Sequence, residues 1–345
     1  MILVGDIGGT KSSLGIFDES DPLSLKKDET YFNKNYPEIG LEGIIKAFLN
    51  QIDAKEIKAA CFGVAGSVKK GRCQLTNLNW TITEEGISKL LNNIPVILIN
   101  DLEAIGLGIS SLSSGQLINL NPNKNINIVN SSSPKAVLAA GTGLGQIGLC
   151  RKSDKIELET FPSEGGHVDF APRNQMEIEL LTYLLKREKF YGHVSYERVL
   201  SGIGLFNIYQ FLRDSNKYGS ESIEVKDRLN GLESNQVAPV ISEFALEKKD
   251  DLCVRALDMF VSIYGAKAGN LALTYSAFGG IFLGGGIAPK IIDKLKDGTF
   301  IAAFKDKGSF SQFVENIPVV VIMEPRIGLW GAISKVISRK DYTIA

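Results

Sequence analysis

Short glycine-rich segments with an acid beside them are the parts of this sequence best suited to do chemistry. In Gly5–Thr10 (GDIGGT), Asp6 precedes a glycine turn at the end of an apolar strand. Glycines there let backbone N–H groups approach an anion, so the segment predicts a phosphate loop, and Asp6 favours a nucleotide whose Mg²⁺ is held through water. The alternative for this segment alone is an ordinary hairpin turn. A Walker-type P-loop is excluded, because Thr10 separates Gly9 from Lys11 and a strand follows where that motif needs a helix.

Two more glycine segments occur later in the chain. Gly141–Gly145 (GTGLG) repeats the turn, and the match of Gly143–Gly148 to the dinucleotide fingerprint G-x-G-x-x-G is accidental, because a strand follows it. Two such glycine hairpins facing each other would hold one polyphosphate from two sides. The triple glycine Gly284–Gly286 lies between a buried strand and a helix with Pro289 at its start, which indicates a surface for a flat ligand or a phosphate. Close helix–strand packing is the alternative.

Polar segments supply the candidate groups for binding and proton transfer. Asn100-Asp101 follows an apolar strand, at the carboxyl end where open α/β sheets bind ligands; the alternative is that Asp101 only caps a helix. Glu164–Asp169 (EGGHVD) places two acids and His167 around a glycine pair, a set able to read several hydroxyls, with a solvated turn as the alternative. Glu197 lies in Gly192–Arg198 (GHVSYER), where a plain surface position is equally compatible with the pattern.

Composition excludes several classes of protein. The chain has 345 residues, with 38 Lys plus Arg against 39 Asp plus Glu and a net charge of -1, so no basic excess indicates a nucleic-acid partner. Four widely separated cysteines without a C-x-x-C pair, and only two histidines, argue against a zinc site and favour reduced thiols. No apolar run reaches the roughly 18 residues of a membrane helix. We therefore expect a cytoplasmic protein with no membrane partner.

The order of expected elements indicates an α/β fold in two related halves. Strands are expected at 2–6, 13–17 and 29–32, then a helix over 39–51, a strand at 57–64, a helix near 83–92 and a strand at 96–100. The opening order recurs as strands at 136–140, 146–151 and 156–160, after an exposed loop at 120–134. Helices are then expected at 174–188, 202–215, 236–247 and 250–274, strands at 280–283 and 319–323, and a final helix from 328.

Taken together, these segments resemble the bacterial glucokinase family of the non-zinc type, within the actin/hexokinase/Hsp70-like phosphotransferase superfamily. The resemblance covers nearly the whole chain, in the family's order, in these segments: Leu3–Thr10, Asn100-Asp101, Gly141–Gly145, Glu164–Pro172, Gly192–Gly202, Phe278–Pro289 and Ala302–Phe310. It implies an α/β fold of two RNase-H-like (actin-like ATPase) domains flanking a ligand cleft. Residues 1–110 would form a small α/β domain completed by the C-terminal helix 326–345, and residues 111–325 a larger, more helical α+β domain.

The resemblance also implies an activity and a set of site residues. The reaction is ATP- and Mg²⁺-dependent phosphorylation of the 6-hydroxyl of glucose in glycolysis, by a homodimer, with a kinase for another hexose or a non-enzymatic actin-like protein as alternatives. Asp101 would be the catalytic base, and Asn100, Asp101, Glu164, His167 and Glu197 would bind the sugar. The ATP site would comprise Gly5, Asp6, Ile7, Gly8, Gly9, Thr10, Gly141, Thr142, Gly143, Gly284, Gly285 and Gly286, with Asp6 reaching magnesium through water and the last three glycines beside the adenosine.

Two positions depart from the family's pattern. Lys11 stands where many relatives have Asn, and Ile203 stands where SGPG is common. Lys11 changes the expected phosphate contacts, and a cation beside a phosphate loop is electrostatically sensible. We also expect glucose to close the site against water, with hinges near 102–118, where Gly106 and Gly108 act as breakers, and near 323–328.

Overall fold

The computed structural model describes residues 1–18, 21–52, 57–75, 78–121, 132–151, 158–187 and 192–338. The chain divides into two compact units. The first comprises residues 1–116, 151–162 and 324–345, and the second comprises residues 117–150 and 163–323.

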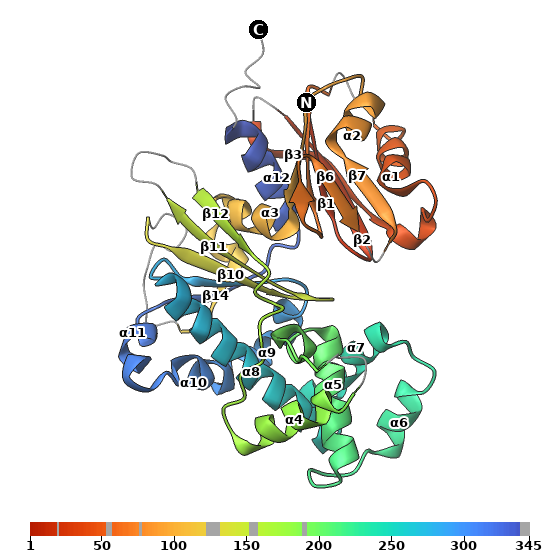
Figure 1. Ribbon diagram of the computed structural model, residues 1–345. Helices are drawn as coiled ribbons and strands as arrows, with labels where there is room; N and C mark the ends of the chain where they lie inside the picture. Colours follow the sequence, from red (N-terminus) through yellow and green to blue (C-terminus); the bar gives the residue numbers. More distant parts are fainter. Residues whose placement is uncertain are drawn as a thin grey trace. The chain divides into compact units, whose positions relative to one another are not determined.

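A five-stranded sheet, part of which is labelled in Figure 1, forms the centre of the first unit, and its strand order is β3-β2-β1-β4-β8. Strands β1 (Ile2–Ile7), β2 (Lys11–Asp18) and β3 (Asp21–Phe32) form an antiparallel meander. Strand β4 (Ala59–Val64) runs parallel to β1, and β8 (Val96–Asn100) runs parallel to β4. Every residue of β4 is buried, as expected for a strand that helices cover on both faces.

Helices cover the two faces of this sheet. On one face, α1 (Gly40–Leu49) and α2 (Glu84–Leu90) join a core through Ile44, Phe48 and Ile87. A small sheet of β5 (Val68–Lys69), β6 (Arg72–Leu75) and β7 (Trp80–Thr83) adds to the same core. On the other face, α3 (Asp101–Gly108) and α12 (Ile327–Ser338) lie side by side (Figure 1) and bury a second core. The carboxyl end of β1 and the end of β8 therefore reach the same edge of one rigid sheet.

A second sheet has six strands in the order β12-β11-β10-β13-β14-β9, and its residues belong to the second unit apart from the end of β11 and most of β12, which lie in the segment 151–162. Strand β10 (Lys135–Ala140) is antiparallel to β11 (Leu144–Arg151), and β12 (Leu158–Ser163) follows at the edge. Strands β13 (Ile281–Gly284) and β14 (Val319–Ile322) continue in parallel from β10, and the short β9 (Leu117–Asn119) closes the far edge in the antiparallel direction. Its first five strands thus repeat the order of the first sheet.

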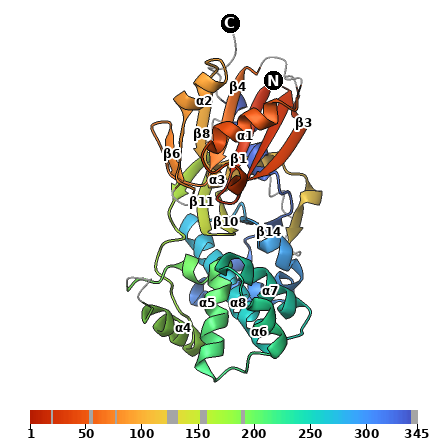
Figure 2. The same cartoon turned by 90° about the vertical axis from the view of Figure 1, so that its right-hand side faces the viewer.

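The second unit is rich in helices. The longest, α8 (Asp251–Tyr275), is largely buried, and Asp250 caps it by accepting the N–H of Cys253 at 2.8 Å. Figure 2 shows α5 (Gly202–Ser215) and α7 (Ser234–Leu246) beside α8, where all three contribute to one core. The remaining helices are α4 (Gln175–Leu185), α6 (Ile223–Leu229), α9 (Ile292–Leu295), α10 (Thr299–Lys305) and α11 (Ser311–Glu315). Single 3₁₀ turns occur at Asn33–Asn35, Ile109–Ser111, Ser114–Gln116, Tyr196–Arg198, Ala288–Ile291 and Gly308–Phe310.

The predicted α/β fold is confirmed, and the strand orders confirm that the opening topology recurs. Strand β9 and helices α6, α10 and α11 were not predicted, and the helix expected after the triple glycine is a 3₁₀ turn followed by the four-residue α9. Gly106 does not break the chain as expected, because it lies inside α3, whereas Gly108 is the last residue of that helix, before the 3₁₀ turn Ile109–Ser111. A Cβ on Gly108 would lie 2.5 Å from the Ile327 carbonyl oxygen, so this glycine permits helix packing. Residues 122–131 of the expected 120–134 loop lie outside the described residues.

Candidate functional site

Asp6 lies near the tip of β1, one residue before the strand ends. Its register partner is Ser13 on β2, and a Cβ on Gly328 would approach its carboxylate to 2.6 Å, so the start of α12 needs a glycine there. Burial raises the pKa of Asp6 to about 6. Its carboxylate has no hydrogen-bond or ion-pair partner among the residues that the structure describes.

The turn after β1 is held by a residue that sequence reasoning missed. Buried Asn33 donates from Nδ2 to the Gly8 carbonyl at 2.8 Å and accepts the Ser12 hydroxyl at 2.7 Å. Its backbone N–H also donates to the Thr10 carbonyl at 3.0 Å. Gly8 donates its N–H to the Lys11 carbonyl at 2.9 Å, while a Cβ on Gly9 would meet nothing within 4 Å. The turn is therefore fixed from behind and open at Gly9.

Asn100 and Asp101 stand at the junction of β8 and α3. Asn100 is the N-cap: its Oδ1 accepts the Leu102 N–H at 2.9 Å, and its Nδ2 donates to the Gly66 carbonyl at 3.1 Å. Asp101 is the first helical residue, and its Oδ1 also accepts the Leu102 N–H, at 2.9 Å. The alternative that Asp101 only caps the helix is thus weakened, because the cap is its neighbour.

Asp101 has the electrostatic character of a proton acceptor. Burial first, and then the nearby charge of Asp6, raise its pKa to about 7, whereas the Leu102 N–H favours the ionised form. A general base is most effective when its pKa lies near the working pH. The first unit therefore brings together a fixed glycine turn, an acid without a partner in the described residues, and an acid whose raised pKa suits it to accept a proton.

The second glycine turn, Gly141–Gly143, connects β10 to β11. The ladder closes at Ala140 and Leu144, so β11 begins two residues earlier than expected. Glu197 reaches this turn, because its Oε2 accepts the Leu144 N–H at 3.0 Å, and a Cβ on Gly143 would lie 2.7 Å from that oxygen. One oxygen of Glu197 is thus committed to the backbone of the turn, and the other is left for a ligand.

Glu164 and His167 lie on a segment that pairs with the turn carrying Glu197. The Glu197 N–H donates to the Gly166 carbonyl at 3.0 Å, and the Tyr196 N–H donates to the Val168 carbonyl at 3.0 Å. Buried Gly165 and Gly166 pack against the start of β11, where Cβ atoms would overlap Gln146 and Leu144. The side chains of Glu164 and His167 are exposed, and neither has a partner among the described residues. The arrangement holds three polar side chains on a fixed backbone.

The third glycine segment lies beside the second in the same unit. Gly284 ends β13, and Gly285 has φ of 79° with the Ala140 carbonyl oxygen 2.4 Å from where its Cβ would be, so only glycine fits there. Gly286 has open space around its Cβ position. The N-terminus of α5 approaches from another direction, because the Gly202 N–H donates to the Gly141 carbonyl at 2.9 Å. Sequence reasoning assigned no role to Gly202, and its place in the motif Gly192–Gly202 was the available signal.

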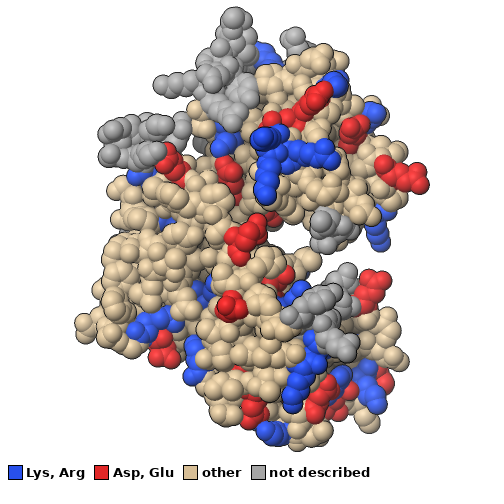
Figure 3. All heavy atoms as spheres, viewed as in Figure 1, with Lys and Arg blue, Asp and Glu red and all other residues tan. Residues whose placement is uncertain are grey.

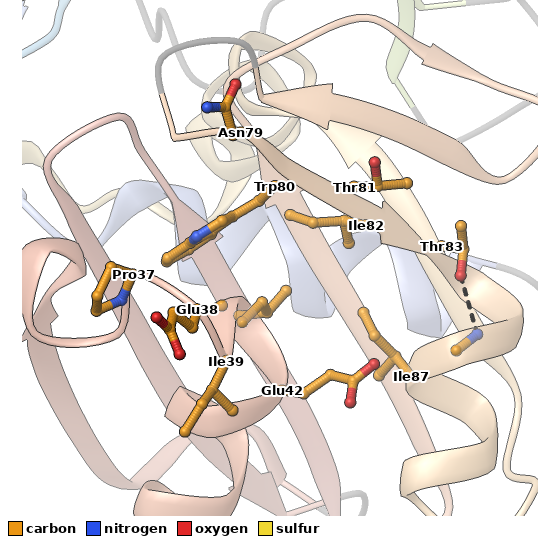
Figure 4. A pocket seen from close by; sticks show the side chains of 13 residues that line it. Pro37, Glu38, Ile39, Glu42, Asn79, Trp80, Thr81, Ile82, Thr83 and Ile87 are labelled. Carbon is orange, nitrogen blue, oxygen red and sulfur yellow. Dashed lines mark hydrogen bonds between the residues drawn. The ribbon is translucent and has the colours of Figure 1, made fainter.

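A separate pocket of about 180 Å³ lies in the first unit (Figure 4). It is lined by residues 37–42 and 79–83, with Gly86 and Ile87 from α2, and Figure 4 shows Trp80, Glu38 and Glu42 around it. None of the predicted site residues lines it. We therefore assign it no part in the chemistry.

Acidic and basic side chains are interspersed on the face drawn in Figure 3. Within the described ranges, no group of three or more His, Cys, Asp or Glu residues lies close enough to hold a metal ion. None of the described helices is long and apolar enough to cross a membrane.

Comparison with known proteins gives matches along nearly the whole chain. The family model described as Glucokinase matches residues 3–338. The glucokinase of Nostoc punctiforme is 40% identical over 342 residues, which cover 96% of this chain and 97% of that protein. The crystal structure of a glucokinase from an Antarctic psychrotroph is 28% identical, with a TM-score of 0.78 and 98% of both chains covered. A Balamuthia mandrillaris glucokinase solved with glucose has the same fold, with 22% identity, a TM-score of 0.80, and coverage of 96% of this chain and 92% of that one.

Proposed function

This chain belongs to the glucokinase family, and from that premise we propose that it transfers the γ-phosphoryl group of ATP to the 6-hydroxyl of glucose, giving glucose 6-phosphate and ADP. The observation that carries the chemical assignment is Asp101, a buried carboxyl at the end of β8 whose pKa is raised to about 7. We further propose that both units have the RNase-H-like topology of the actin-like ATPases. The shared strand order of their two sheets supports this.

Asp101 acts as the base in this proposal. A sugar hydroxyl is a weak nucleophile, and a carboxylate within hydrogen-bond reach accepts its proton as the bond to phosphorus forms. The Leu102 N–H holds one carboxylate oxygen at 2.9 Å, which fixes the orientation of the group and leaves the second oxygen for the hydroxyl. A pKa near 7 leaves a large fraction of Asp101 ionised at neutral pH while keeping it basic enough to take the proton.

Glu164, His167 and Glu197 read the other sugar hydroxyls. Support comes from their backbone: the segments carrying them are joined through the Glu197 N–H and the Gly166 carbonyl, and the side chains of Glu164 and His167 have no partner among the described residues. The Asn100 side chain is less free to bind sugar than expected, because its amide already forms hydrogen bonds with the Gly66 carbonyl and the Leu102 N–H. We assign it a contact with sugar through the lone pair left on Oδ1.

The glycine segments hold ATP. Gly5–Thr10 and Gly141–Gly143 bind its phosphates, and Gly284–Gly286 lies beside the adenosine; the open Cβ positions of Gly9 and Gly286 support close approach. The Asp6 carboxylate, a hard oxygen ligand without a partner in the described residues, fits a magnesium ion held through water. Such an ion neutralises charge on the transferred phosphoryl group.

A coupled assay with a panel of hexoses and phosphoryl donors tests the proposal. We expect ADP release to depend on glucose, and phosphorus NMR of the product to show the phosphate on the 6-hydroxyl. EDTA is expected to abolish the activity and added Mg²⁺ to restore it. A clear preference for another hexose, or a phosphate on another hydroxyl, would overturn the assignment of substrate or position.

A further inference from the structure

Lys267 is a buried cation that the mechanism above does not use. It lies in the middle of α8 with 5% of its surface exposed, and it forms no ion pair with any residue in the described part of the chain. Its ammonium donates to the Gly165 carbonyl at 3.1 Å and lies 4.4 Å from the centre of the Tyr196 ring. These two contacts belong to the two segments that carry Glu164, His167 and Glu197.

A charge in this place is costly for the fold. Burial lowers the pKa of Lys267 to about 8, so the ammonium is still mostly protonated at neutral pH. Among the described residues, only the Gly165 carbonyl and the Tyr196 ring offset the free-energy cost of burying this charge. The face of an aromatic ring attracts a cation, but it replaces the lost hydration only in part. If the side chain at this position only filled space in the core, Met or Leu would do so without the free-energy cost of burying a charge.

Helix α8 presents this lysine on a defined side. Gly265 and Gly269 lie against α10, where their Cβ atoms would come within 2.1 and 2.4 Å of the Phe300 and Phe304 carbonyl oxygens. Lys267 lies about 200° around the helix from Gly265, and Asn270 follows it by one turn. Asn270 donates to the Tyr196 hydroxyl at 3.3 Å. The helix is thus clamped to α10 on one side and directs two donors at the sugar-reading segments on another.

We propose that Lys267 is a positioning residue for sugar binding, which ties the Glu164–His167 segment to the turn Tyr196–Arg198 and so sets the spacing of Glu164 and Glu197. This rests on the proposed roles of those two acids. Gly165 follows Glu164 in the chain, and Tyr196 precedes Glu197, so each contact of the ammonium is one residue from a sugar-reading acid.

The test separates binding from stability through steady-state kinetics. Lys267→Met keeps most of the side-chain volume and removes the donor and the charge. We expect the KM for glucose to rise about ten- to a hundredfold, as for loss of a hydrogen bond from a charged donor, with the KM for ATP within about twofold of wild type. Lys267→Arg keeps the charge and is expected to recover part of the glucose KM.

A matched control comes from Lys294, which also contacts α8, through an ion pair with Asp258. Lys294→Met is expected to lower Tm without changing the KM for glucose, because loss of stability reduces the amount of active enzyme and not the affinity of what remains. If Lys267→Met behaves like this control, the positioning role is wrong. If it does not fold, the same decision is made on Lys267→Arg, where an unchanged glucose KM together with a lowered Tm overturns the proposal.

The roles of the acids are tested apart from the lysine. Glu197→Gln alone must raise the glucose KM, or the sugar site itself is misassigned, whatever Lys267 does. In the double variant Glu197→Gln/Lys267→Met, we expect the two effects to be less than additive, because the lysine acts through the segment that carries Glu197. Full additivity would contradict a connection between them.

Discussion

The two glycine turns differ in what surrounds them, although each connects the first two strands of a sheet with the same strand order. In the first unit four residues separate the paired Ile7 and Ser12, whereas three separate Ala140 and Leu144 in the second. The residue before the last of the first strand is Asp6 in one and Ala139 in the other. The first turn is braced by Asn33 and has acids with raised pKa values near it, while the second is braced by Glu197.

The two turns share a backbone arrangement but differ in the side chains beside it. Both turns offer backbone N–H groups, which serve any phosphate. Among the described residues, the first turn alone has Asp6 and Asp101 near it, the acids proposed for a hydrated cation and for proton transfer, and the second alone is braced by a proposed sugar ligand, Glu197.

The largest effect is expected for Asp101→Asn in the first unit. Removal of the base is expected to lower kcat by about 10²–10⁴-fold, because the sugar hydroxyl loses its proton acceptor. Glucose affinity measured by calorimetry is expected to stay close to wild type, since Asn keeps the shape and the polar contacts. Turnover near the wild-type rate would remove Asp101 from the role of base.

The contrast between the turns is sharpened by two glycine substitutions. Gly9→Ala adds a methyl group into open space, so Tm is expected to stay unchanged while the KM for ATP rises about tenfold through a blocked approach of phosphate. Gly143→Ala places a Cβ 2.7 Å from the Glu197 carboxylate, which must shift to make room. The shift is expected to weaken the hydrogen bond that Glu197 accepts from the Leu144 N–H. It is expected to cost about 1 kcal/mol of stability and to raise the KM for glucose.

Denaturation and steady-state assays of both variants provide the measurement. Gly286→Ala is a useful companion, because it too adds a Cβ into open space, and it lies in the second unit. If Gly9→Ala changes Tm and leaves the KM for ATP alone, the first turn is a structural hairpin. If Gly143→Ala leaves glucose binding intact, Glu197 only braces the turn.

The sequence predicted the turns and the strands beside them, because buried strands ending in glycines have a strong local pattern. It could not predict the residues that fix them. Asn33 reaches Gly8 across 25 positions, and Lys267 reaches Gly165 across 102, so neither pairing leaves a local signal. Gly108 likewise has a close contact that no local pattern predicts, because a Cβ there would meet the Ile327 carbonyl oxygen. The short helices α10 and α11 have too few turns for a periodic pattern.

A smaller effect is expected in the pH dependence of stability. Asp101 has a pKa of about 7 in the folded protein, above its ordinary value, so the folded state binds this proton more tightly than the unfolded state does. The resulting contribution to the free energy of unfolding is fully present at low pH and is lost as pH rises through about 7. Asp101→Asn stays neutral and escapes this loss. We expect the variant to melt a few degrees above wild type at about pH 8, and the advantage to shrink towards about pH 4. An advantage independent of pH would show that Asp101 is not a destabilised carboxyl.

The smallest effect concerns Lys11, the first residue of β2, directly after the first turn. Its ammonium lies 4.9 Å from the centre of the Phe32 ring, it is exposed, and it forms no ion pair in the described part of the chain. Because Asp6 pairs with Ser13, and Lys11 is two residues from Ser13, Lys11 lies on the same face of the sheet as Asp6. A cation there attracts phosphate, but solvent screens an exposed charge, so Lys11→Asn is expected to raise the KM for ATP only about two- to fivefold. The difference is expected to shrink between about 0.05 M and about 0.3 M salt, because the Debye length falls.

Lys34→Asn, which removes the same charge from a nearby exposed position, serves as the control. Equal effects from both variants would mean that ATP senses only the net charge of the unit, and Lys11 would then add nothing specific to the first turn.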